Sequence, residues 1–219
     1  MYSASDLLDA LEGIAYITNP SGLIIDICRK GWAKSATANE MPALNDAQPY
    51  IGRSVFDSIS GDTVRYFYRR LMDDIVSGKR ADASFTMRCD APSRRRELRM
   101  SVTPIAASGI NRALLFHALP ISETLRPPIN LFDRQALFDA LKANQHLPFV
   151  VICSFCLQVR VQEAAAGQSS VWVEAEEYYR LGGSSDVQLS HGLCPSCAER
   201  MKQSILDTSA DLARANDGG

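Results

Sequence analysis

Two four-residue segments, Cys153-Ser154-Phe155-Cys156 and Cys194-Pro195-Ser196-Cys197, stand out from the rest of the chain. A pair of cysteines with two residues between them can direct both sulfurs to one point. The two segments together therefore supply four thiolates for one tetrahedral metal ion. A shell of four sulfurs leaves no coordination position for substrate or water. The spacing predicts a structural zinc site whose ligands are Cys153, Cys156, Cys194 and Cys197.

Two other interpretations of these cysteines stay open from the sequence. Buried free thiols fit poorly, because four of the six cysteines fall in the two paired segments. A redox role is the second alternative, since Cys-Pro-x-Cys also occurs in dithiol oxidoreductases.

The composition is that of an ordinary globular protein. The 219 residues are 46% hydrophobic and 22% charged, with a net charge of −2, so no general attraction to nucleic acid or to an anionic membrane is expected. The longest apolar run, residues 147–153, has the length of a strand, and we expect no membrane span. The first residues lack a basic region followed by an apolar one. We therefore expect a cytoplasmic protein whose thiols stay reduced and available to a metal.

The order of the predicted elements indicates an α+β domain. These elements are a helix at 5–11, strands at 14–18 and 23–28, short helices within 30–60, a long helix from 62 to 78, and strands at 84–89, 98–102 and 113–119. The long helix has apolar side chains at helical spacing between Val64 and Ile75. The last strand is apolar on both faces, which places it in the middle of a five-stranded antiparallel sheet.

This layout resembles a PAS domain, in which two strands, a block of short helices ending in one long helix, and three strands follow one another. The resemblance covers about residues 5–120 and includes Asn19-Pro20-Ser21-Gly22 and Ile51-Gly52-Arg53-Ser54-Val55-Phe56. It implies a sheet whose last strand lies between the first and the fourth, with helices on one face. It also implies a sensing or docking module with an internal pocket.

The resemblance does not identify a cofactor for that pocket. The Asn-Cys-Arg-Phe-Leu-Gln sequence of flavin-binding PAS photosensors is absent, and the long helix has no histidine to ligate haem. His117 lies on the predicted central strand, where we expect a hydrogen-bonded core or interface histidine. An unidentified small molecule in the pocket and a pocket filled by side chains both stay open.

The chain divides into three predicted segments. Residues 1–120 form the PAS-like sensor domain, 121–146 a Pro-rich linker and connecting helix, and 147–219 a four-cysteine zinc lobe with a C-terminal helix. A lobe this small buries little apolar surface, so a metal would supply the missing stability.

The third segment has a resemblance of its own. Ser190-His191-Gly192-Leu193-Cys194-Pro195-Ser196-Cys197 resembles a cysteine-rich tail of bacterial sensor and response-regulator proteins. This resemblance implies two-component signalling partners, such as a histidine kinase or a response regulator. His191 is a candidate fifth ligand, but we expect it to hydrogen-bond a thiolate or a turn carbonyl instead.

These features predict a non-catalytic bacterial signalling protein. Its PAS-like domain senses a small ligand or docks a partner, its zinc lobe serves protein interaction, and a homodimer is expected through the N-terminal helix or the outer sheet face. A thiol-based redox sensor is the alternative. Nucleic-acid binding is disfavoured, because acidic residues outnumber basic ones in the lobe and the basic run Arg94-Arg95-Arg96 is expected in a solvated turn. An enzyme is not expected, since no catalytic constellation stands out.

Overall fold

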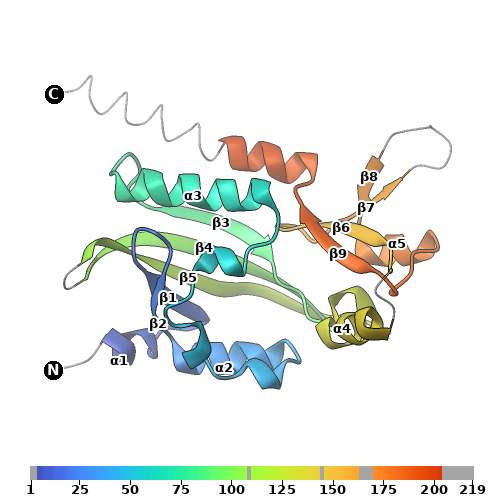
Figure 1. The fold of residues 1–219 in the computed structure, drawn as a ribbon, viewed down its shortest axis with the longest axis horizontal. Helices are drawn as coiled ribbons and strands as arrows, with labels where there is room; N and C mark the ends of the chain where they lie inside the picture. The colour runs from blue at the N-terminus through green and yellow to red at the C-terminus, as the bar shows by residue number, and fades with distance from the viewer. Residues whose placement is uncertain (1–3, 108–109, 144–145, 163–169, 204–219) are drawn as a thin grey trace.

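The computed structural model describes residues 4–107, 110–143, 146–162 and 170–203 (Figure 1). Its larger sheet is antiparallel, with five strands in the order β2-β1-β5-β4-β3. The strands are β1 (Ile14–Thr18), β2 (Ile24–Ile27), β3 (Ala83–Arg88), β4 (Arg94–Ala107) and β5 (Ile110–Leu125). The last strand lies between the first and the fourth, as the PAS resemblance implied. The predicted α+β, PAS-like sheet is therefore confirmed.

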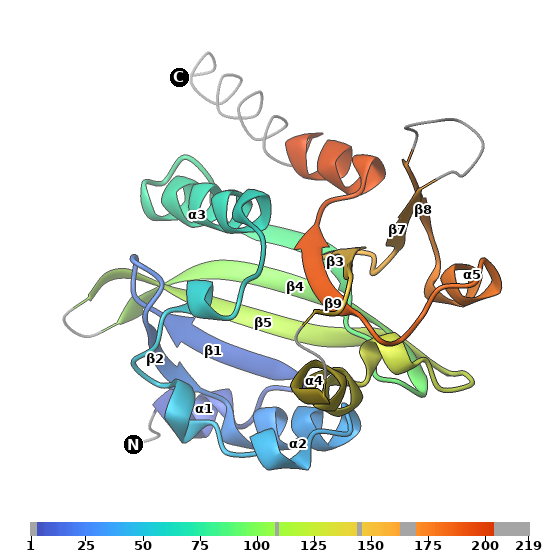
Figure 2. The same ribbon diagram turned by 45° about the vertical axis from the view of Figure 1, so that its right-hand side comes forward.

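Helices lie against this sheet on both sides. The labelled helices are α1 (Ala4–Leu8), α2 (Arg29–Ala38), α3 (Asp62–Val76), α4 (Arg134–Ala143) and α5 (Ala175–Arg180), with short 3-10 helices η1 (Pro42–Leu44), η2 (Gln48–Tyr50), η3 (Val55–Asp57) and η4 (Asn130–Phe132). α3 runs along one face (Figures 1 and 2), and the end of α2 meets the same face, where Arg96 donates to the Ala38 carbonyl. Leu8 packs against Ala15 on the opposite face. Among the described residues, no helix has the length and apolar character needed to cross a lipid bilayer.

The main core lies between α3 and the sheet. Phe67 of α3 meets Phe85 of β3 edge to face, with ring centroids 5.7 Å apart, and Tyr16 of β1 stacks on Phe116 of β5 at 4.9 Å. Such pairs add stability beyond the apolar area they bury. Side chains fill the space between α3 and the sheet, whereas a cavity of about 370 Å³ lies between α2 and the sheet, lined by Ile14, Ala38 and Leu98 among others. Both states left open for the pocket implied by the PAS resemblance therefore stay open.

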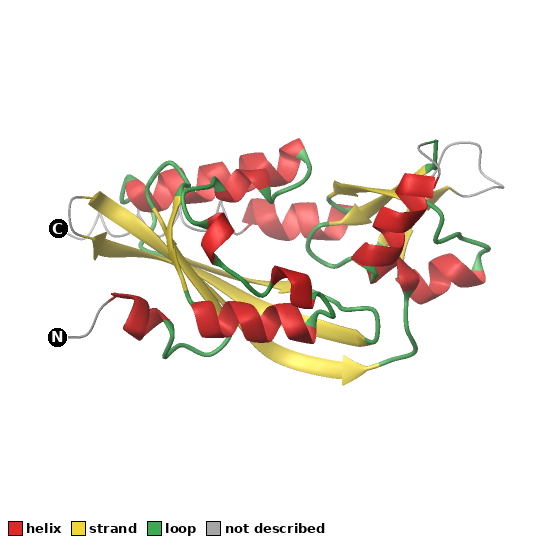
Figure 3. Cartoon of the chain, turned by 60° about the horizontal axis from the view of Figure 1, so that its bottom comes forward, coloured by secondary structure: helices red, strands yellow, loops and turns green. Residues whose placement is uncertain are grey.

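A smaller sheet, in the order β8-β7-β6-β9, forms the cysteine lobe. Its strands are β6 (Phe149–Cys153), β7 (Val159–Gln162), β8 (Ser170–Val173) and β9 (Gln188–Gly192). β6 and β9 are parallel, with Cys153 opposite Gly192. Parallel pairing brings the carboxyl ends of both strands, and so both cysteine segments, to the same edge. Figure 3 shows the two sheets next to one another with helices around each.

A helix over residues 195–203 follows the second cysteine segment, and the rest of the predicted C-terminal helix lies outside the described residues. Its Met201 is buried in the core cluster that contains the α3 side chains. The lobe also meets α3 at Gly61, which has φ 87° and precedes the helix. A Cβ at Gly61 would lie 2.9 Å from the His191 carbonyl oxygen, so only glycine permits this approach.

The connection between the two sheets starts later than expected. β5 continues to Leu125, beyond residue 120, where we placed the start of the linker. η4 and α4 follow, and Asp133 caps α4 by accepting a hydrogen bond from the Ala136 N–H at 2.9 Å. None of the residues of α4 is buried.

The prediction of a solvated turn for the basic run 94–96 is wrong. These arginines are the first residues of β4, and the turn precedes them, with Ala91 bridged to Arg94. Arg96 is 4% exposed and donates to Glu123 at 2.7 Å, directly across the strand pair. The long β5 supplies a partner strand and a counter-charge, so the basic segment is extended and paired.

Candidate metal centre

Four cysteine sulfurs converge at the edge of the small sheet. The Sγ atoms of Cys153, Cys156, Cys194 and Cys197 all lie within 4.8 Å of one another, and those of Cys156 and Cys194 are 3.6 Å apart. A tetrahedral Zn²⁺ with Zn–S bonds of about 2.3 Å holds its sulfurs about 3.8 Å apart. The donor set and its spacing therefore fit one thiophilic metal ion such as Zn²⁺.

Local backbone geometry directs these sulfurs. Cys153 ends β6, and the chain reverses at once, because its N–H donates to the Gln158 carbonyl at 2.8 Å and Leu157 has φ 58°. The N–H of Cys194 donates to Cys153 Sγ at 3.5 Å, and that of Cys197 donates to Cys194 Sγ at 3.4 Å. Cys194 and Cys197 also lie at the amino end of the helix at 195–203, where negative charge is favoured.

The four thiols differ in how far they are exposed to solvent. Cys153, Cys194 and Cys197 are at most 2% exposed, whereas Cys156 is half-buried. Arg200 donates to Cys197 Sγ at 2.9 Å, and this bond raises the pKa of Arg200. A divalent ion with four thiolates carries a net charge of −2, so a neighbouring guanidinium offsets part of it.

Hydrogen bonds among Cys153, Cys156 and Cys197 shift the pKa values of these three thiols. Hydrogen bonds from Cys156 and Cys197 lower the pKa of Cys153, and the same contact with Cys153 raises the pKa of Cys156. The hydrogen bond to Cys153 also raises the pKa of Cys197, to about 11. The hydrogen bonds thus favour one thiolate, at Cys153, and a bound divalent metal would favour the thiolate form of its ligands.

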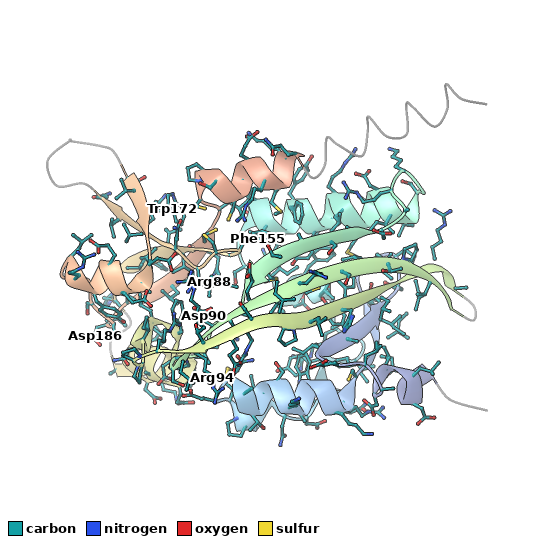
Figure 4. All side chains as sticks on the ribbon, turned by 180° about the vertical axis from the view of Figure 1, so that it is seen from behind. Arg88, Asp90, Arg94, Phe155, Trp172 and Asp186 are labelled. Carbon is teal, nitrogen blue, oxygen red and sulfur yellow. The ribbon has the colours of Figure 1, made fainter. Side chains whose placement is uncertain are left out.

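Phe155, between the first two cysteines, enters the core of the larger sheet (Figure 4). Its ring is 2% exposed, and its centroid lies 5.7 Å from those of both Phe67 and Phe85. Its carbonyl oxygen accepts a hydrogen bond from the Arg88 N–H at 2.7 Å. The first cysteine segment is therefore attached to the larger sheet by both side chain and backbone.

Buried charges reinforce this junction, among them Arg88 and Asp90, which Figure 4 labels near the lobe. The Arg88 guanidinium donates to the Cys156 carbonyl at 3.0 Å and to Glu174 of the lobe at 2.5 Å. The Asp90 side chain is fully buried and pairs with both Arg88 and Arg126. Glu174 of the lobe thus pairs with Arg88 of the first domain, and Glu176 of the lobe pairs with Arg126 of the linker at 3.5 Å.

The two histidines singled out from the sequence have different outcomes. His117 is hydrogen-bonded as expected, with Nε2 2.6 Å from the Glu12 carbonyl oxygen. The expectation for His191 is wrong, because its ring bonds neither a thiolate nor a carbonyl of any described residue. It lines a cavity of about 610 Å³ at the junction of the two sheets, the junction cavity. Burial and the charge of Arg134 lower the pKa of His191.

Sequence reasoning missed the residues that join the lobe to the first domain. Alternation along β3 assigns Arg88 to the polar face with Ser84 and Thr86, yet Arg88 is 8% exposed. The lobe covers it, and no local pattern reports such a contact. An apolar Phe155 inside a cysteine segment was the one available signal, since a turn around a metal has no need of a large aromatic side chain.

No family model and no curated protein matches the chain. A search of solved structures finds the PAS domain of BvgS from Bordetella pertussis, with a TM-score of 0.40 and 12% identity over 64% of this chain and 93% of that chain. The PAS domain of nitrogen regulation protein NR(II) from Vibrio parahaemolyticus has a TM-score of 0.37 and 13% identity over 55% and 100%. The PAS domain of an HTR-like protein from Haloarcula marismortui has a TM-score of 0.34 and 12% identity over 53% and 93%. The fold assignment rests on the strand order described above.

Proposed function

We propose that this chain is a non-catalytic signalling module in which a PAS-like domain and a four-cysteine zinc lobe act as one regulatory unit. Phe155 is the observation that carries the proposal. Metal ligands flank it, and its ring packs against Phe67 and Phe85 of the PAS-like core. A change in ligation therefore displaces an aromatic ring from that core, and a change in the core displaces the ligands.

In this proposal Zn²⁺ is structural and is held by Cys153, Cys156, Cys194 and Cys197. Support comes from the convergence of the four sulfurs and from the burial of three of them. A saturated four-sulfur shell has no position at which a substrate could bind, which favours regulation over catalysis. We keep the division into 1–120, 121–146 and 147–219 as a proposal, with β5 extending the first unit to Leu125.

The output of such a module is a contact with another protein. We propose a cytoplasmic signalling partner of the two-component type, either a histidine kinase or a response regulator, and a homodimer. Two exposed apolar side chains, Leu7 of α1 at 62% exposure and Leu11 just after α1 at 37%, support an interface at the N-terminal helix.

Two other functions have less support. A redox sensor needs thiols that oxidants can reach, and only Cys156 of the four is more than slightly exposed. Nucleic-acid binding needs free cations. Arg95 pairs with Glu174 at 3.4 Å and Arg96 is buried, so the basic run is engaged within the protein.

Native and denaturing mass spectra of full-length protein purified without added metal test the proposal. We expect one zinc per chain in the native spectrum and none after denaturation. Cys153→Ser should lose the zinc. The matched control Cys28→Ser should keep it, because Cys28 lies outside the cluster and serine can replace its Sγ as the cap that accepts from the Gly31 N–H. Metal-free protein with disulfides between the two cysteine segments would refute the structural zinc site and favour the redox sensor.

A further inference from the structure

The junction cavity has walls from both domains. Its lining residues come from the start of α3, the end of β3, α4, the first cysteine segment and β9. Its volume of about 610 Å³ is in the range of small-molecule sites in proteins, about 300–1,000 Å³.

α4 supplies an apolar wall that the protein itself does not cover. Its three large apolar side chains, Leu137, Phe138 and Leu141, all line the cavity, yet none of them is buried. Phe138 is 52% exposed and Leu141 is 38% exposed. Across the cavity, Val64 and Tyr68 of α3 and Ile152 of β6 present further apolar surface. An apolar body placed here would bury surface that is now in water.

The cavity lining carries one positive charge that has no ion-pair partner among the described residues, the guanidinium of Arg134. Arg134, the first residue of α4, is exposed and lines the cavity, and it forms no ion pair with any residue that the structure describes. Asp90, the one carboxylate in the lining, is fully buried and already paired with Arg88 and Arg126. An anionic group entering the cavity therefore meets a free guanidinium and no free carboxylate.

One further polar group faces this space. The hydroxyl of Ser154, inside the first cysteine segment, lines the cavity, and its Oγ is buried without a hydrogen-bond partner among the described residues. Buried hydroxyls are normally hydrogen-bonded, so an occupant with an acceptor would satisfy Ser154.

We propose that the junction cavity binds a small amphipathic monocarboxylate, with the carboxylate on Arg134 and an apolar chain or ring against Leu137, Phe138 and Leu141. Such a ligand would touch Phe155 and Ser154 directly, because both line the cavity. Its occupancy would thereby act on the cysteine segment that holds the metal. This inference rests on the proposed sensory function and names the chemical class sensed and the place of sensing.

Calorimetric titration of the zinc-loaded full chain with octanoate tests the inference, with 1-octanol as the uncharged probe of equal chain length. We expect octanoate to bind one per chain and more tightly than 1-octanol. Arg134→Gln should weaken octanoate by about tenfold to a hundredfold and leave 1-octanol unchanged, since a hydrogen bond to a charged group is worth about 1.5–3 kcal/mol. Leu141→Trp should weaken both probes by filling the apolar wall.

Arg99→Gln and Leu181→Trp are the matched controls. Both residues are exposed and lie outside the cavity lining, so these variants should bind octanoate as the unmodified chain does. Equal binding of the two probes, or an Arg134→Gln variant that binds octanoate normally, would overturn the inference. Zinc is measured on the same samples. If the zinc-loaded protein does not bind octanoate, only the ligand class is refuted. If the protein purifies without zinc, the proposed function is refuted.

Discussion

Phe155 has two sets of constraints that come from different parts of the chain. Its backbone lies between Cys153 and Cys156, and its carbonyl accepts from the Arg88 N–H. Its ring lies against Phe67 and Phe85. A core aromatic ring is ordinarily positioned by its own strand or helix. Here a short turn positions it, and the four-cysteine cluster is what holds the turn.

Phe155→Ala should lower the free energy of unfolding by about 3 kcal/mol or more, because it removes a ring that is 2% exposed and leaves a cavity in a packed core. Urea unfolding followed by far-ultraviolet circular dichroism measures the loss. Phe149→Ala is the matched control, since Phe149 is 70% exposed and its removal should cost less than about 0.5 kcal/mol. Equal losses in the two variants would show that the ring does not complete the core.

At the scale of the elements, β4 and β5 extend beyond the core of the sheet. Their ends pair Arg94 with Leu125 and Arg96 with Glu123. Glu123 accepts hydrogen bonds from both arginines, and these bonds, led by the one from Arg96, lower the pKa of Glu123. The charged ends of the two strands are held together by one partly exposed carboxylate.

Glu123→Gln should reduce stability at neutral pH and not at acid pH. Since the pKa of Glu123 is lower in the folded protein than in the unfolded chain, its contribution is present above the unfolded pKa and is lost as pH falls through the folded pKa. Because Glu123 is 37% exposed, the difference at pH 7 should be less than about 1 kcal/mol. Urea midpoints across the acid range measure it. The same measurement on Glu97→Gln, an exposed neighbour on β4 with no ion pair to any described residue, is the matched control, and an equal effect there would contradict the role of Glu123.

The same two strands show where sequence patterns stop being informative. The alternation at 84–89 and the doubly apolar run at 113–119 predicted β3 and the central β5, because a sheet face imposes that spacing on each strand separately. The ends of β4 and β5 carry Arg94 to Arg96, Pro120 and Glu123. Their extended structure depends on ion pairs across the strands, and no segment read by itself contains that information.

The candidate site divides in the same way. The spacing within each cysteine segment predicted the convergence of four sulfurs, because a tight turn is a local property. The contacts of Phe155 and Arg88 join segments far apart in the chain and depend on how the lobe packs against the first domain. His191, on β9, lines the junction cavity. The predicted elements gave no indication that such a cavity exists.

At the scale of the whole molecule, the junction makes the lobe part of the first domain's core. The core cluster that contains the α3 side chains also contains Cys153, Cys194, Cys197 and Met201. Loss of order in the lobe should therefore reach α3 and β3.

With zinc bound at the four cysteines, as proposed, its removal with a chelator should lower the thermal midpoint by about 10 °C or more, because a structural metal contributes its binding free energy to folding. Hydrogen exchange measured by mass spectrometry should rise in the lobe and also in α3 and β3. The chelator should have no further effect on Cys153→Ser, which serves as the control. Exchange that rises in the lobe alone would show that the two units are independent.

The position of Phe155 in the chain also has a consequence for biosynthesis. Phe67 and Phe85 are made well before Phe155, and Cys194 and Cys197 follow later still. While the ribosome is translating the lobe, the first domain is complete in sequence but lacks one of the rings of its core, and its aromatic surface is open to chaperones and to aggregation. With zinc as the ion, as proposed, the supply of zinc to the nascent chain sets how long that exposure lasts.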